Sequence, residues 1–191
     1  MKDYIDECIN EAIETKKKLS DLKEDIEKIS SIIVQSFKQS GKVVFCGNGG
    51  SAADSQHLAA EFISLLDSKN PRASLPALAL TTNTSIKTAI ANDFGFEHVF
   101  SRQVEGLVTD KDVVIGISTS GNSPNVLNAL KTAKGKGAKV IGFTGATGGK
   151  MIELELDAIL KAPSENCNRI QEIHITAGHI MCGAVEKAMF N

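Results

Sequence analysis

Hydrophobic residues in the first 39 positions recur at steps of three and four, the spacing of one face of an α-helix. We therefore predict helix over residues 1–39, with apolar faces that pack on the domain and also against another subunit. The residues of the two stripes are Ile5, Cys8, Ile9, Ala12 and Ile13, and then Leu22, Ile26, Ile29, Ile33 and Phe37.

From residue 40 onward, the pattern changes to short aliphatic runs separated by helical stretches. Most of the runs lack polar alternation, which is typical of strands covered on both faces. Because strands alternate with helices, the pattern predicts one α/β domain with a five-stranded parallel sheet and right-handed crossovers. The predicted strands are 42–46, 76–80, 112–118, 138–144 and 157–162, and the predicted helices are 51–67, 83–91, 124–136, 149–155 and 166–189.

The predicted first strand is followed by a glycine-rich loop, GNGGS, at residues 47–51. Its three glycines let the backbone approach a ligand closely and adopt positive φ. Ser51 is a candidate cap for the next helix, whose N-terminal amides favour negative charge. The loop matches neither the GxGxxG nor the Walker pattern, and a tight strand-to-helix turn is an equally good reading.

A hydroxyl-rich loop, STSGNSPN, follows the strand predicted at 112–118. Pro124 suits the first turn of a helix, with Ser123 as its cap. Hydroxyls and free amides at a helix start suit a phosphate without a lysine, so we predict a neutral cradle for a small phosphoester. The alternative is a solvated turn. The hydroxyls belong to Ser118, Thr119, Ser120 and Ser123.

Two pairs of residues have the side chains needed for metal binding or proton transfer. His57 and Glu61 lie one helical turn apart and share a face, although such a pair is often only a surface pair. Gln171 and His179 are eight residues apart in the last predicted helix, a spacing that does not prove a shared metal. Together they suit zinc or proton transfer. We assign His174, between two isoleucines, a structural or surface role.

One further polar pair, Asn92 and Asp93, stands in an otherwise apolar stretch. These side chains either bind sugar hydroxyls or cap a break in a helix. The residues alone leave both possibilities open.

Composition limits the classes of partner. The chain has 191 residues with 42% hydrophobic and 23% charged positions, as in soluble globular proteins. We divide this single domain into N-terminal helices over 1–40 and an α/β part over 41–191. The net charge of −2 gives no reason to expect nucleic acid or a membrane surface as partner. A charged N-terminus and four cysteines without CxxC spacing favour a cytoplasmic protein with free thiols.

Four segments in combination resemble the phosphoheptose isomerases, enzymes with a sugar isomerase (SIS) domain. These segments are CGNGGSAADSQH followed by Glu61, ANDFGFEHVFSRQVE, GISTSGNSPNVLNAL and NRIQEIHITAGHIMCGAVE. The resemblance covers nearly the whole chain. It implies a flavodoxin-like three-layer fold, a homotetramer with active sites between subunits, and one bound zinc per subunit. The implied reaction converts sedoheptulose 7-phosphate to D-glycero-D-manno-heptose 7-phosphate, the first step toward nucleotide-activated heptose, with lipopolysaccharide as the usual destination.

The resemblance also assigns roles to individual positions of this sequence. The implied zinc ligands are His57, Glu61, Gln171 and His179. The implied substrate contacts are Asn48, Gly49, Gly50, Ser51, Glu61, Asn92, Asp93, Ser118, Thr119, Ser120, Ser123 and Gln171. For catalysis, we expect Glu61 to move the carbon-bound proton as a base and His179 to serve the oxygens as an acid, through an enediol(ate).

Two other functions remain open at this point. Some SIS proteins bind a replication initiator without catalysing a reaction, but those tend to lack part of the metal and acid–base set that is complete here. A different phosphosugar isomerase or a sugar-sensing regulator is the second alternative. A regulator would usually carry a DNA-binding module, and no basic helix-turn-helix segment is visible.

Overall fold

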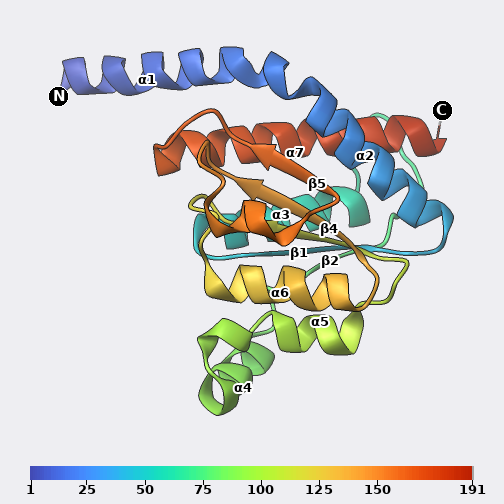
Figure 1. Cartoon of the computed structure of the whole chain (residues 1–191). Helices are drawn as coiled ribbons and strands as arrows, with labels where there is room; N and C mark the ends of the chain where they lie inside the picture. The colour runs from blue at the N-terminus through green and yellow to red at the C-terminus, as the bar shows by residue number, and fades with distance from the viewer. Residues whose placement is uncertain (191) are drawn as a thin grey trace.

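The computed structural model describes residues 1–190 and contains one parallel sheet (Figure 1). The strand order is β2-β1-β3-β4-β5, so the chain passes from β1 to β2 on one side and then crosses back to β3 on the other side of β1. This is the order of flavodoxin-like doubly wound sheets, and it confirms the predicted fold class. The strands are β1 (Val43–Gly47), β2 (Ala77–Ala79), β3 (Val113–Ile117), β4 (Lys139–Thr144) and β5 (Ala158–Lys161).

The helices follow the predicted pattern with several differences, among them an unpredicted 3-10 turn at Phe96–His98 and a 3-10 helix at Gly149–Leu154. The N-terminal helix is broken by a 3-10 turn, η1, and the helix predicted at 51–67 ends at Ile63. The sequence pattern missed α5, which is only seven residues long. The helical elements are α1 (Lys2–Lys17), η1 (Lys18–Leu22), α2 (Lys23–Lys38), α3 (Gly50–Ile63), α4 (Thr84–Phe94), η2 (Phe96–His98), α5 (Ser101–Leu107), α6 (Pro124–Gly135), η3 (Gly149–Leu154) and α7 (Cys167–Phe190).

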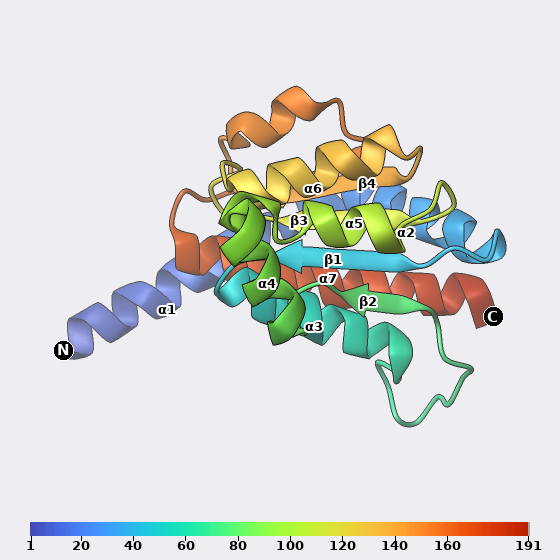
Figure 2. The same ribbon diagram turned by 90° about the horizontal axis from the view of Figure 1, so that it is seen from below.

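Helices cover both faces of the sheet and form three layers (Figure 2). Side chains of β1 alternate between two apolar clusters: Val43 and Phe45 pack with α2, α3 and α7, whereas Val44 and Cys46 pack toward α5 and α6. Both faces are therefore dry, which explains why the strand sequence lacks polar alternation. None of the described helices combines the length and hydropathy of a bilayer-spanning segment.

The two apolar stripes of the N-terminal region have different environments. The second stripe, from Leu22 to Phe37, is at most 8% exposed and packs against the sheet and α7. The first stripe lies on α1, which extends beyond the layered body (Figures 1 and 2). Its residues Ile5, Ile9 and Ile13 are about half exposed, at 47%, 52% and 47%. The expectation that this stripe packs on its own domain is therefore wrong for these three isoleucines.

His174 is a buried structural histidine. Its Nε2 lies 3.0 Å from the carbonyl oxygen of Thr144 at the end of β4, and its ring packs against Phe143. Nδ1 is buried without a hydrogen-bond partner in the described structure. Burial lowers the pKa of His174 from 6.5 to about 4, so the ring is neutral at pH 7 and donates through Nε2.

This histidine predicts a pH dependence of stability. Because its folded pKa lies below the unfolded value, its contribution is complete above pH 6.5 and is lost as the pH falls toward 4. Between pH 7.5 and 5.0 we expect a loss of about 2 kcal/mol in the free energy of unfolding. The His174→Gln variant should lose about 2 kcal/mol less over the same interval in urea titrations. An equal pH dependence in both proteins would show that His174 protonates freely when folded.

Candidate active site

Two loops meet where the strand order reverses, at the carboxyl ends of β1 and β3. Ligands in open α/β sheets bind at this position. Asn48 follows β1, and Asn125 lies in the first turn of α6, after β3. Their side-chain amides exchange two hydrogen bonds of 2.8 Å each, and the Asn125 oxygen also accepts from the amide of Val126 at 2.9 Å. This pair fastens the glycine-rich loop to the hydroxyl-rich loop.

The hydroxyl-rich loop gathers its side chains on one side. The Ser118 hydroxyl lies 3.0 Å from that of Ser123 and 3.5 Å from that of Ser120. The amide of Asn122 donates to Ser120 Oγ at 3.1 Å. Gly121 has φ of 65°, and a Cβ at this position would overlap the carbonyl oxygen of Gly148. Only glycine fits this turn, which brings three serines together.

The start of α6 differs from the prediction in one respect. Pro124 begins the helix and Ser123 is its N-cap residue, as expected, but the Ser123 side chain makes no capping bond. It turns toward Ser118 instead, so the hydroxyl joins the loop cluster. Thr119 lines a hollow of about 230 Å³ beside Ser120, and its hydroxyl accepts from Cys167 Sγ at 3.5 Å. The geometry suits an anion held by hydroxyls and helix amides.

The glycine-rich loop brings the last helix close to the first helix of the α/β part. A Cβ at Gly50 would overlap Nε2 of Gln171, so only glycine lets the Gln171 side chain of α7 lie against the start of α3. Ser51 does not cap this helix, because α3 starts one residue earlier with Gly49 as N-cap. Ser51 is instead 5% exposed inside the first turn, and the capping prediction for it is wrong.

His57, Glu61 and His179 converge between α3 and α7. His57 Nε2 lies 2.8 Å from His179 Nε2 and 3.2 Å from Glu61 Oε1. One candidate ligand atom from each residue lies within 4.8 Å of the others. The His57 side chain is 49% exposed and that of Glu61 is 17% exposed. His57 and Glu61 share one face of α3, as expected, and both lie close to His179.

This donor set fits a metal ion. Two imidazole nitrogens that face each other at 2.8 Å require one of them to carry a proton. An ion bound to both nitrogens and to a carboxylate oxygen removes that requirement, and two His with one Glu is a common zinc set. Gln171, the fourth predicted ligand, lies against Gly50 at the start of α3. Its membership of the group stays a prediction.

Asp54 is a site neighbour that the sequence analysis missed. It precedes His57 by three residues and Glu61 by seven, so the three share one face of α3. Its Oδ2 is buried without a hydrogen-bond partner among the described residues. Burial raises the pKa of the Asp54 carboxyl, and the charge of His57 offsets part of that rise. The spacing of Asp54, His57 and Glu61 was the available signal.

Asn92 and Asp93 lie in the last turn of α4 and are both exposed. The Asn92 amide donates to the Asp93 carboxylate at 2.8 Å. Helix α4 borders a cavity of about 350 Å³ that also touches the glycine-rich loop, through Gly49 on one side and Thr88 on the other. Neither Asn92 nor Asp93 lines this cavity, so their contact with substrate stays a prediction.

Two residues that contact the glycine-rich or hydroxyl-rich loop were also missed. Asn125 directly follows Pro124, and no sequence pattern signals its bond to Asn48. Lys150, in η3, donates its backbone amide to Asn122 Oδ1 at 2.9 Å, which places a lysine next to the loop that was expected to be neutral. These contacts join segments 28 and 77 residues apart, which local patterns cannot reveal.

Known proteins resemble this chain over nearly its full length. The phosphoheptose isomerase of Aneurinibacillus thermoaerophilus is 48% identical over 193 aligned residues, covering 100% of this chain and 96% of that protein. That of Roseiflexus sp. is 52% identical over 162 residues, covering 85% of this chain and 81% of that protein. The solved structure of phosphoheptose isomerase GmhA from Neisseria gonorrhoeae is 42% identical, with a TM-score of 0.90, and covers 97% of this chain and 98% of that chain.

The family model described as "SIS domain" matches residues 4–145, which include both loops and the α3 face with His57 and Glu61. The match begins inside α1, so it includes most of the N-terminal helices as well as the first strands of the sheet. The chain therefore belongs to the phosphoheptose isomerase family of SIS-domain enzymes.

Proposed function

We propose that this chain converts D-sedoheptulose 7-phosphate to D-glycero-D-manno-heptose 7-phosphate. The observation that carries the proposal is a site with two ends, one rich in hydroxyls and one with two imidazoles and a carboxylate. The Asn48–Asn125 amide pair joins the loops of the first end, and the approach of Gln171 to Gly50 links them to α7. A ketose phosphate has the matching ends, a phosphate and a carbonyl.

The phosphate is held at the loop that contains Ser118, Thr119, Ser120 and Ser123. The clustered serine hydroxyls donate to phosphate oxygens, and the N-terminus of α6 adds a favourable partial charge. Asn48 to Ser51 border the sugar from β1. Asn92 and Asp93, in the last turn of α4, form hydrogen bonds with the hydroxyl groups of the sugar. These contacts fix the chain of the sugar so that C1 and C2 lie near α3 and α7.

The reaction moves one carbon-bound proton and redistributes the hydroxyl protons. Glu61 takes a proton from C1, exchanges it with solvent and delivers a proton to C2, through an enediol(ate). Its Oε1 faces His57, which leaves Oε2 for the substrate. His179 acts as the acid that serves the oxygens, and each such proton transfer typically contributes about 10²–10⁴-fold to the rate.

His57, Glu61, Gln171 and His179 would hold one zinc ion per subunit. The support is the convergence of two imidazole nitrogens and a carboxylate oxygen. When bound, zinc supplies Lewis-acid polarisation of a carbonyl oxygen. A carboxylate that serves as ligand is a weaker base, so Glu61 loosens from this role during turnover or the ion mainly organises the site.

The working assembly is a cytoplasmic homotetramer with active sites between subunits. The support is the half-exposed apolar stripe of α1 and a groove of about 940 Å³ between α2 and α7, bordered by Ile26, Val34 and Ile180. We assign residues 1–40 to this assembly and 41–191 to the isomerase part. The product enters nucleotide-activated heptose and lipopolysaccharide synthesis.

A non-catalytic role in binding a replication initiator is not favoured. The four residues of the metal and acid–base set are all present, and the similar proteins of high identity are named as isomerases. Co-purification with an initiator protein, without any isomerisation of sedoheptulose 7-phosphate, would reverse this preference.

Glu61→Gln should lower kcat by about 10²–10⁴-fold and leave KM for sedoheptulose 7-phosphate within about threefold, because the amide cannot accept the proton. NMR in deuterated water measures turnover and should show deuterium at C2 of the wild-type product. Glu153→Gln, at an exposed position of η3, is the matched control and should behave as wild type. Wild-type turnover of Glu61→Gln would remove this residue from the mechanism.

His57→Ala should weaken zinc binding by on the order of 10²-fold or more, because it deletes one of the converging ligands. Isothermal titration of metal-stripped protein with Zn²⁺ measures the change. His98→Ala provides the matched histidine control, since His98 lies in η2 outside the convergent group. Equal zinc affinity of His57→Ala and wild type would argue against a metal between α3 and α7.

Ser120→Ala should raise KM for sedoheptulose 7-phosphate by about tenfold with little change in kcat, because a hydrogen bond to a charged group contributes about 1.5–3 kcal/mol. Steady-state kinetics measure both constants. Ser68→Ala, at an exposed position between α3 and β2, should leave both unchanged. A KM of Ser120→Ala equal to that of wild type would place the phosphate elsewhere.

A further inference from the structure

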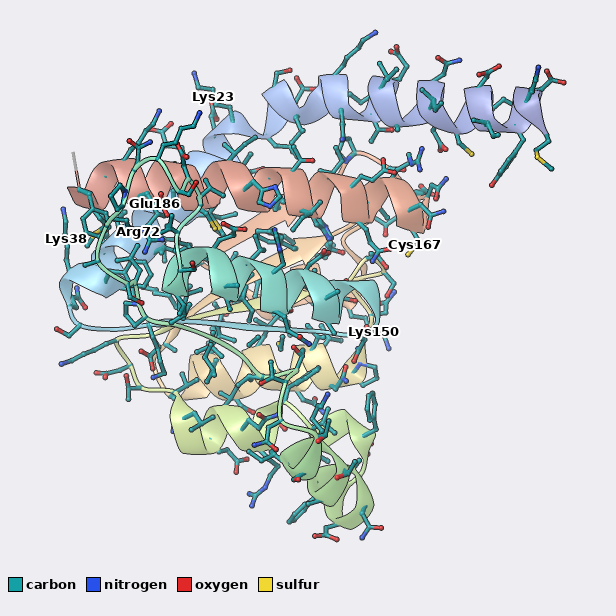
Figure 3. The ribbon with its side chains drawn as sticks, turned by 180° about the vertical axis from the view of Figure 1, so that it is seen from behind. Lys23, Lys38, Arg72, Lys150, Cys167 and Glu186 are labelled. Carbon is teal, nitrogen blue, oxygen red and sulfur yellow. The ribbon has the colours of Figure 1, made fainter. Side chains whose placement is uncertain are left out.

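A buried ion pair lies at the C-terminal end of α3 (Figure 3). Arg72 comes from the connection between α3 and β2, and Glu186 lies on α7. Their side chains are 4% and 14% exposed, and Arg72 Nε donates to Glu186 Oε1 at 2.8 Å. The amide of Leu66 donates to the same oxygen at 3.1 Å.

The guanidinium of Arg72 also binds the end of α3 directly. Its Nη2 donates to the carbonyl oxygen of Glu61 at 2.7 Å, and its Nη1 donates to that of Phe62 at 2.8 Å. With Ala73 and Glu186 as further acceptors, its hydrogen bonds number five, which equals the N–H groups of arginine. The last carbonyls of a helix otherwise lack partners, and a cation is favourable there.

The same two helices carry the site. Glu186 follows His179 by seven residues, so the two side chains project from one face of α7. On α3, one of the two carbonyl groups that Arg72 binds belongs to Glu61 itself. At the level of the site, a Cβ at Gly178 would overlap the side chain of Leu58, so the helices are in close contact there. Figure 3 shows α3 and α7 side by side, with Arg72 and Glu186 toward the end remote from Cys167.

We propose that Arg72 and Glu186 are positioning residues that hold Glu61 and His179 at the spacing required for metal binding and proton transfer. The link passes from the Arg72 guanidinium to the Glu61 backbone on one helix, and from Glu186 through two turns of α7 to His179. This inference rests on the proposed function for its catalytic consequence. The structural claim, that the ion pair keeps the ligand atoms of His57, Glu61 and His179 close together, does not depend on which reaction the site catalyses.

The test compares Co²⁺ binding by wild type and by the double variant Arg72→Met/Glu186→Leu. Removing both charges avoids leaving one of them buried alone. We expect the folded double variant to bind Co²⁺ about 10–100-fold more weakly in visible-absorbance titrations, the effect usual for residues that orient metal ligands. With zinc bound, kcat should fall about 10–100-fold while KM changes less than about threefold, because the phosphate loop is untouched.

Two controls separate positioning from general stability. Glu186→Gln keeps a carbonyl acceptor for Arg72 and should retain Co²⁺ affinity within about threefold of wild type. Lys42→Met removes another ion pair, the 2.6 Å contact between the residues that precede β1 and β3, Lys42 and Asp112. It should lower the melting temperature and leave Co²⁺ affinity and kcat unchanged.

The outcomes are distinct. A folded double variant with wild-type Co²⁺ affinity would overturn the positioning role, as would wild-type protein that binds no Co²⁺. If the double variant does not fold, Arg72→Lys decides, because an ammonium has three N–H donors instead of five and lacks the planar fork that spans the α3 carbonyls and Glu186. Its Co²⁺ affinity should fall at least about threefold, and no change would overturn the inference. Weaker Co²⁺ binding in the variants, with no sedoheptulose 7-phosphate turnover by wild type, would reject the proposed reaction alone.

Discussion

The close packing of α3 against α7 is the contact on which the candidate site depends. Because Gly50 has no side chain, there is room for Gln171 beside it, and Gly178 leaves room for Leu58 in the same way. A methyl group at either glycine would displace the side chain of Gln171 or of Leu58 from its present position. Proton transfer and metal coordination both require atoms placed within fractions of an ångström, so an interface set by glycines is well suited to hold imidazoles and a carboxylate from two helices.

The switch point of the sheet explains why the two kinds of chemistry lie close together. Strands β1 and β3 are neighbours in the sheet but are separated by β2 in the sequence. Their following loops therefore meet at one edge, and the Asn48–Asn125 pair fixes their relation. The glycine-rich loop then leads directly into α3. A single short segment thus borders the hydroxyl-rich loop at its start and carries a histidine and a carboxylate two to three turns later.

Local patterns predicted most of the fold, because each strand is a short run of apolar residues buried on both faces and each long helix has an apolar face. They missed α5, whose seven residues are too few to establish a period, and the break at η1. For the site, the spacing of His57 and Glu61 was sufficient to place both on one face. The meeting with His179 could not be derived from spacing, and neither could the roles of Asn125 and Arg72, because each depends on contacts between distant segments.

The His57–His179 contact joins residues 122 positions apart. Closing a loop of this length costs conformational entropy, so the contact depends on α7 being packed against α3. A chain that has assembled only β1, α3 and β3 possesses one imidazole and one carboxylate on an unpaired helix, which is a weak ligand pair. The candidate metal site is therefore complete only in molecules in which α7 has docked against α3.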